Sequence, residues 1–196
     1  MRRRQFIMTG SAALAVAGLS LTGCTTTSLS SSTSSSANAS KRDTINAGVD
    51  STLARLYENV DGSRELVEKA RGVLVFPSVI AAGFWVGGQY GEGALRVGGR
   101  TVGYYSTVAG SFGLQIGAQS KALIFLFMTQ EALDKFLRSQ GWAVGADATV
   151  AVLKVGANGA VDTSTATSPV EAFVLTNGGL MAGISLEGTK VSRLII

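Results

Sequence analysis

The sequence predicts an α+β domain in which a bent antiparallel β-sheet or partial barrel packs against two or three helices. Two patterns carry this prediction. Apolar residues recur at three- and four-residue steps between positions 45 and 60, as on one face of a helix. Residues 72–118 hold 12 glycines in 47 positions among β-branched and aromatic residues, a density that disfavours helices and marks turns and bulges in β structure. A signal peptide and a disordered linker are expected to precede the domain.

The first 23 residues are predicted to be a lipoprotein signal peptide. Three arginines at positions 2–4 are followed by an apolar stretch at 12–21, which is shorter than the roughly 20 residues that span a bilayer. The string Leu21-Thr22-Gly23-Cys24 resembles the bacterial lipobox, in which the cysteine receives diacylglycerol and a further acyl chain such as palmitate. We therefore expect lipidation at Cys24. A plain secreted protein with a chance cysteine is the alternative.

The export route and the membrane are open at this stage. Residues 3–7 look like the twin-arginine export motif, and an ordinary positive start explains the same arginines. Thr25 follows the cysteine where lipoproteins of the inner membrane often carry Asp. By that resemblance we expect an envelope protein anchored to the outer membrane and facing the periplasm, with surface exposure as a further possibility.

Residues 24–40 are predicted to be a lipidated cysteine and a Ser/Thr-rich linker. Twelve of the sixteen residues 25–40 are Ser or Thr, and almost nothing apolar is available for burial. Such a segment is expected to be disordered and to hold the domain, residues 41–196, close to the membrane.

Composition excludes several classes of protein. The chain has no His and one Cys, which rules out a Ser-His-Asp triad, a His-ligated metal and an intrachain disulfide. Residues 1–23 carry three of the 17 basic groups, so the mature chain has 17 − 3 = 14 basic and 13 acidic groups. A net charge near +1 argues against nucleic-acid binding. No P-loop or GxGxxG string occurs, and no carboxylate pair has a catalytic spacing. We expect no enzymatic activity, no cofactor and no metal.

The bounds of the remaining helices and strands are predicted from Gly and Pro, which interrupt regular structure, and from Ser and Thr, which cap helices. The first helix is expected to begin near Lys41 and to end at Asp61-Gly62, and a shorter helix follows with Ser63 as its N-cap. A buried strand is expected to start at Gly72 and to end at Pro77. Further strands are predicted at 121–128, 149–155, 170–176, 180–186 and 190–196, with a hairpin turn at 177–178 and a helix between Thr129 and Gly141.

Two groups of side chains are candidates for binding. The helical region carries six basic residues, balanced in sequence by six acids, so a solvated helix face is the default interpretation. Aromatic residues of the glycine-rich half form the second group, for which core packing is favoured over an apolar ligand pocket. The basic candidates are Lys41, Arg42, Arg55, Arg64, Lys69 and Arg71.

Several long strings resemble one known family. GVLVFPSVIAAGF, VGGQYGEGAL, TVGYYSTVAGSFGLQIGAQ, FLFMT and SLEGTKV occur in that order and are similar to the SYLF domain family (Ysc84-type), including bacterial lipid-binding SYLF lipoproteins. The resemblance runs from about residue 45 to the C-terminus. It implies non-catalytic binding of phosphoinositides and other anionic lipids through a basic N-terminal segment, which corresponds here to residues 41–71. Eukaryotic relatives add SH3 or FYVE modules and some bind actin; we expect neither module nor the actin role here.

Two functions are favoured by these observations, and an enzyme acting on a lipid or glycan, which would need a pocket with converging carboxylates, is a third hypothesis. The first is an envelope lipoprotein whose domain binds anionic headgroups of membrane lipids through the six basic residues. The second is a structural or protein-interaction module, with an unknown protein partner, that uses lipid only as an anchor. An exposed apolar patch or sheet edge would favour the second.

Overall fold

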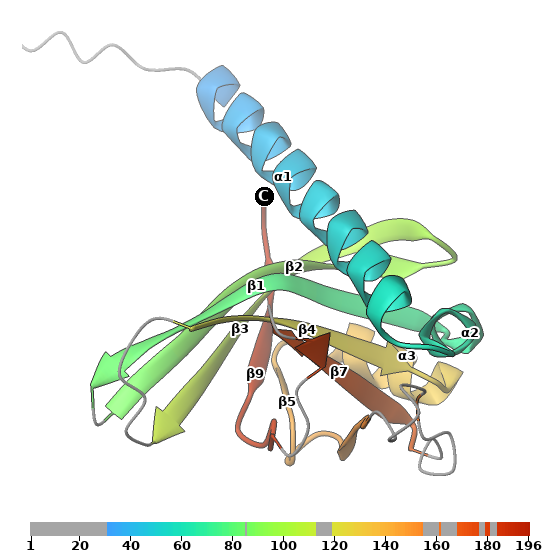
Figure 1. Cartoon of the computed structure of the whole chain (residues 1–196). Helices are drawn as coiled ribbons and strands as arrows, with labels where there is room; N and C mark the ends of the chain where they lie inside the picture. The colour runs from blue at the N-terminus through green and yellow to red at the C-terminus, as the bar shows by residue number, and fades with distance from the viewer. Residues whose placement is uncertain are drawn as a thin grey trace, which may run out of the picture.

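The computed structural model describes residues 31–84, 86–112, 119–154, 161, 168–176, 179–180 and 184–196. Cys24 and the predicted signal peptide lie outside the described residues. Within them the chain forms three helices and a single nine-stranded sheet (Figure 1). The helices are α1 (Ser31–Asn59), α2 (Ser63–Lys69) and α3 (Gln130–Arg138). The strands are β1 (Gly72–Phe84), β2 (Val86–Val97), β3 (Arg100–Phe112), β4 (Gln119–Phe127), β5 (Trp142–Ala143), β6 (Val150–Val152), β7 (Val170–Thr176), β8 (Gly179–Leu180) and β9 (Lys190–Leu194).

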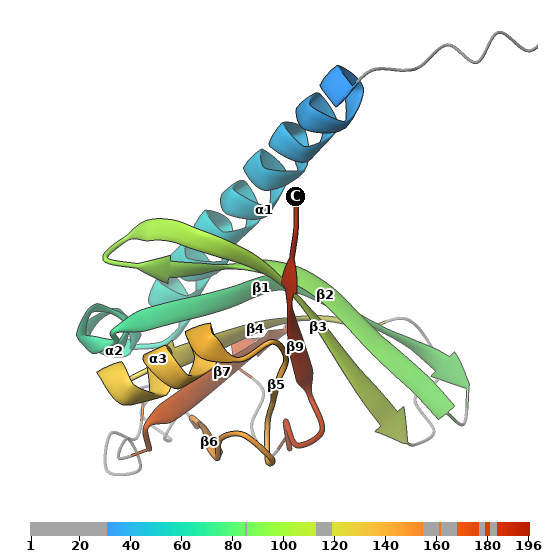
Figure 2. The ribbon, with the colours of Figure 1, turned by 180° about the vertical axis from the view of Figure 1, so that it is seen from behind.

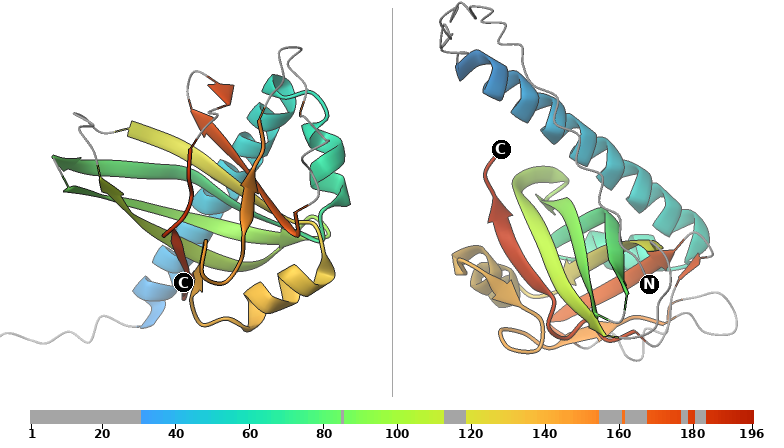
Figure 3. Two further views of the ribbon diagram at one scale, coloured as in Figure 1. Left: turned by 90° about the horizontal axis from the view of Figure 1, so that it is seen from below. Right: turned by 90° about the vertical axis from the view of Figure 1, so that its left-hand side faces the viewer.

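The sheet curls strongly into a half-barrel, which confirms the predicted α+β class (Figure 3). Its strand order is β5-β9-β3-β2-β1-β4-β7-β6, and β8 pairs with β7 as the predicted hairpin requires. Every described pair is antiparallel except β6 with β7. The prediction of a purely antiparallel sheet is therefore wrong at this edge. The chain between Val152 and Val170 is long enough for the crossover that a parallel pair needs.

Helices cover both faces of the sheet. On the outer face, α1 crosses β1 and β2 diagonally (Figure 1), and its buried stripe of Ile45, Val49, Leu53 and Leu56 joins the core formed with side chains of β1, β4 and β7. On the inner face lies α3 (Figure 2), whose Phe136 packs at 5.6 Å from the Trp142 ring. The apolar residues that recur at three- and four-residue steps in the sequence therefore form the face of α1 that packs on the sheet.

Aromatic side chains mostly fill the inner core, as core packing predicts. Trp142 is 1% exposed and meets Phe125, Phe127 and Phe136 edge-on, at centroid distances of 5.6 to 6.0 Å. Tyr105 is buried beside the same rings, whereas Tyr90 stays on the surface. These packed rings tie α3 and β5 to the inner face and fix its curvature.

Helix α1 starts earlier than the sequence predicts. The expected boundary of the disordered linker and the domain lies at residue 41, yet residues 31–40 continue the helix toward its N-terminus. The docked part of α1 supplies a helical template, and adding residues to an existing helix avoids the cost of nucleation. The predicted N-cap of α3 is confirmed: the Thr129 side chain accepts a hydrogen bond from the Ala132 amide at 3.2 Å.

Two local predictions are wrong. Pro77 does not end its strand, because β1 runs on to Phe84 with a register shift between Val75 and Ser78 that accommodates the missing N–H. Ser63 is the first residue of α2, after Gly62 at φ 81°, and its buried hydroxyl donates to the Leu56 carbonyl at 3.2 Å. The predicted strand 190–196 is shortened to 190–194, and the prediction 149–155 contains the strand 150–152. Of the predicted strand 180–186, Leu180 belongs to β8 and 184–186 are not in a strand, while residues 155 and 181–183 lie outside the described residues.

Candidate functional site

The predicted basic residues are mostly engaged within the domain. Lys41 of α1 lies 2.8 Å from the Glu92 carboxylate on β2, which also accepts from the Tyr90 hydroxyl at 2.6 Å. Burial alone would raise the pKa of Glu92, but the hydrogen bonds from Lys41 and Tyr90 outweigh it and hold that pKa below its usual value. The same bond to Glu92 raises the pKa of Tyr90 to about 12. The Lys41–Glu92 ion pair therefore connects α1 to β2 of the sheet.

The other three candidates outside the grooves lie at separate places on the domain. Arg55 donates to the Thr176 carbonyl at 3.1 Å, and Lys69 pairs with Glu65, one turn away on α2, at 2.7 Å. Arg71 is exposed just before β1, where its backbone amide donates to Phe127. The six basic residues therefore do not gather into one patch, and only Arg42 and Arg64 line an open groove among those described below.

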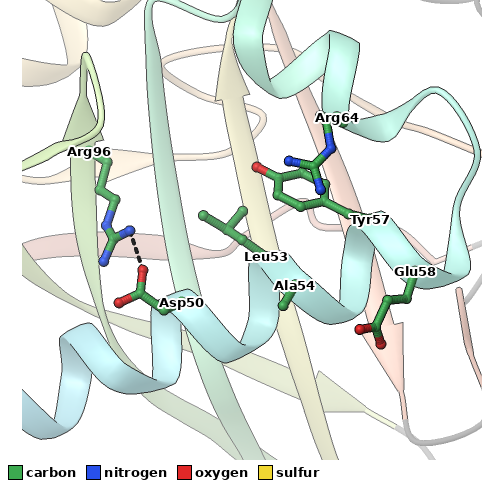
Figure 4. A pocket seen from close by; sticks show the side chains of 7 residues that line it. All are labelled: Asp50, Leu53, Ala54, Tyr57, Glu58, Arg64 and Arg96. Atoms are coloured by element: carbon green, nitrogen blue, oxygen red, sulfur yellow. Dashed lines mark hydrogen bonds and ion pairs between the residues drawn. The ribbon is translucent and has the colours of Figure 1, made fainter.

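Arg64 lines a groove between α1, α2 and β2, which we call the Tyr57 groove (Figure 4). Its guanidinium lies 4.2 Å above the Tyr57 ring, a cation–π contact, and Arg96 on the opposite wall donates to Asp50 at 2.5 Å. The groove has a volume of about 390 Å³. Asp50 and Glu58 balance the two arginines, so this groove offers no excess of positive charge.

Arg42 lines a second groove, the Arg42–Arg193 groove, formed by α1, the start of β3 and the end of β9. Its volume is about 650 Å³, and its lining holds two arginines, no acidic side chain, and the apolar residues Val102 (48% exposed) and Ile195 (94% exposed). Arg42 donates to the main-chain oxygen of Ile196 at 2.8 Å. Positive and apolar surface thus lie side by side.

Polar contacts fix the wall of this groove. The Asn46 side chain on α1 donates to the Tyr104 hydroxyl at 2.9 Å and accepts from Thr101 at 2.8 Å, both on β3. Arg193 lies on a strand that the sequence did predict, and Val102 lies in the glycine-rich β region for which no strand bounds were predicted. Nothing in their spacing singles them out. Only the pairing of β9 with β3 brings Arg193 opposite Tyr105 and near Arg42.

An exposed apolar row crosses the outer face beyond α1. Ile80, Tyr90 and Val108 are directly paired on β1, β2 and β3 and are 52%, 50% and 52% exposed. Paired side chains on adjacent strands lie within contact distance of one another. We call these three residues the Ile80 row.

Neither a membrane-spanning helix nor a metal cluster is found where the structure is described. None of the described helices combines the length and the apolar character needed to cross a bilayer. No group of three or more Asp, Glu, Cys or His side chains gathers there in a metal-binding arrangement. The surface features that remain are open grooves with charged and apolar walls, which are typical of a binding domain.

Comparison with known proteins identifies the family. Residues 108–193 match the family model described as "Ysc84: Las17-binding protein actin regulator". A relative from Xenopus laevis, SH3 domain-containing YSC84-like protein 1, is 33% identical over 129 residues. That alignment covers 63% of this chain and 38% of the relative, so the chain spans less than half of that protein. The predicted resemblance is confirmed over residues 108–193, which match the Ysc84 (SYLF) model; that family is of actin- and lipid-binding type rather than a catalytic one.

Proposed function

We propose that this protein is an envelope lipoprotein, anchored through Cys24, whose SYLF domain binds anionic membrane lipids without catalysis. The observation that carries the proposal is the Arg42–Arg193 groove, whose lining includes two arginines beside exposed Val102 and Ile195 and no acidic side chain. Guanidinium groups hydrogen-bond phosphate oxygens in pairs, and apolar side chains at the rim suit acyl chains. Phosphoinositides and other anionic lipids both present such phosphates.

Cys24 anchoring and groove binding would act together. One acyl chain alone holds a protein reversibly, and a second signal makes attachment stable. The outer membrane facing the periplasm is the proposed location, for which Thr25 after the lipobox cysteine is the supporting feature.

Vesicle flotation tests the role of the groove. The full chain carrying Cys24→Ser, which blocks lipidation, is compared with the same chain carrying Arg42→Met and Arg193→Met in addition. Each basic group near an anionic surface contributes about 1 kcal/mol, so removing two weakens binding to phosphatidic acid vesicles roughly thirtyfold at low salt. Arg138→Met, an exposed arginine of α3, is the matched control and leaves binding unchanged. Equal binding by all three chains at low salt would refute the groove as the lipid site.

The second candidate is a protein-interaction module, which the Ile80 row favours because three aligned apolar side chains are exposed together. Here Ile80→Ser with Val108→Ser would abolish recovery of a partner from envelope extract and leave vesicle binding intact. Loss of vesicle binding in that variant, with the partner retained, would assign the row to lipid instead.

A further inference from the structure

A small polar pocket on the inner face is not explained by either proposal. It lies between β1, β2, β3 and β4 and the segment before β9, with a cavity volume of about 30 Å³. Buried Val79, Leu123 and Leu186 form its apolar lining, and the polar lining residues are Gln89, Thr107, Lys121, Ser185, Glu187 and Thr189. A space of this size admits one or two water-sized groups, such as the oxygens at the tip of an anion.

Two polar groups in this pocket lack partners. Thr107 is 1% exposed, and its hydroxyl has no hydrogen bond. Lys121 on β4 is half-buried and makes no ion pair or hydrogen bond with any described residue. Both residues occupy inner-face positions, since Lys121 pairs with inner Val79 and Thr107 alternates with inner Tyr105. An unpaired hydroxyl and an unpaired ammonium therefore line one small cavity.

The charge of Lys121 is uncompensated. Burial lowers the pKa of Lys121, and no carboxylate offsets that effect. Glu187 also lines the pocket but is exposed at its rim, outside ion-pair distance of the ammonium. Partial burial of the Lys121 side chain without a counter-charge costs free energy of folding, and such local costs are typical of binding sites.

We propose that this pocket binds the oxygen atoms of an anionic group, a phosphate or carboxylate, between the Lys121 ammonium and the Thr107 hydroxyl. The bound oxygens supply the hydrogen-bond partner that Thr107 lacks and the negative charge that Lys121 lacks. The cavity accepts only the tip of the group, so the remainder of the ligand lies outside the half-barrel. A phosphate of this kind belongs either to a free small molecule or to a lipid headgroup; the second form rests on the proposed lipid-binding function.

The test uses the full chain and its Lys121→Met, Thr107→Val and Lys190→Met variants. Lys190, an exposed lysine of β9, is the matched control. Inorganic phosphate at constant ionic strength is expected to raise the melting temperature of the parent chain and of Lys190→Met, with at least about tenfold weaker apparent affinity in the other two variants. Lys121→Met is also expected to melt higher than the parent without phosphate, which separates loss of binding from loss of folding.

Vesicles distinguish the two sources of the anion. Response to inorganic phosphate identifies a free anion as sufficient, whereas response only to vesicles of phosphatidic acid, and not of phosphatidylcholine, assigns the pocket to a headgroup. An identical response of Lys121→Met and the parent to both probes, or no response to either, would overturn the proposal. The Arg42–Arg193 groove is unchanged in these variants, so failure here leaves the proposed lipid function to its own test.

Discussion

Glu171 is a buried carboxylate whose two oxygens have no hydrogen-bond partner among the described residues. It lies in β7, paired with Leu126 and Ala151, and is 0% exposed. Neither carboxylate oxygen has a hydrogen-bond partner. Burial raises the pKa of Glu171 above its ordinary value of 4.5, while the backbone of Ser168 acts in the opposite direction without a hydrogen bond to either oxygen. We predict that Glu171→Gln stabilises the domain at neutral pH.

The effect has a defined dependence on pH. Burial makes the pKa of Glu171 higher in the folded chain than in the unfolded chain. The folded chain therefore keeps the Glu171 proton at pH values where the unfolded chain has lost it. The stability of the parent chain is therefore full below the unfolded pKa and falls as the pH rises toward the folded pKa, by about 1.4 kcal/mol per pH unit. Glutamine does not titrate, so Glu171→Gln removes this slope. Its advantage starts near zero at about pH 4 and grows with pH until the folded pKa is passed.

Urea denaturation from pH 4 to 8 measures this difference. Glu68→Gln, an exposed glutamate of α2, is the control and should keep the pH slope of the parent chain. Glu171→Leu should also lose the slope, which shows that the charge and not the amide is responsible. A slope in Glu171→Gln equal to that of the parent would refute the assignment of the penalty to this carboxylate.

Three further predictions follow from single contacts. Trp142→Ala should lower the free energy of unfolding by about 3–5 kcal/mol in urea denaturation, because a buried ring that meets three phenylalanines is lost; a loss below about 1 kcal/mol would contradict this packing. A Cβ on Gly93 would lie 2.1 Å from a carbonyl oxygen of β1, so Gly93→Ala should cost about 3 kcal/mol, whereas Gly88→Ala, with open space, should change stability by less than about 0.5 kcal/mol; equal thermal melting of the two would argue against the close approach. Ultraviolet titration should give Tyr90 a pKa of about 12, and Glu92→Gln should bring that pKa toward 10.0; no change on substitution would exclude the hydrogen bond as its cause.

Local patterns in the sequence are sufficient for the docked part of α1, for α3 and for β4. The apolar stripe at 45–60 predicts the buried face of α1, and Thr129 predicts the start of α3, since both depend on residues within a few positions. Pro77 misleads because the bulge that tolerates it depends on how β1 pairs with β2 and β4. Ser63 misleads because Gly62, in the left-handed region at φ 81°, takes the cap position.

The candidate site is less accessible to sequence reasoning. The six basic residues were chosen by charge and position, but some of their partners come from other elements: Lys41 pairs with Glu92 on β2, 51 residues away, and Arg42 donates to the main-chain oxygen of Ile196, 154 residues away. Arg193 and Lys121 were not singled out, because each lies in a strand outside the helical region from which the basic candidates were taken. No local spacing predicts which strands become neighbours.

The sequence alone predicted the resemblance to the SYLF family and the α+β class, since these depend on periodicity, composition and ordered motifs. It also supplied the lipobox string at Cys24, which stays a prediction. The tertiary structure decided which charges are free. It pairs Lys41 with Glu92, opens the Arg42–Arg193 groove, and leaves Lys121 and Thr107 without partners inside the half-barrel. The physical reason is that charge compensation acts between side chains a few ångströms apart, and sheet pairing brings together residues that lie far apart in the chain.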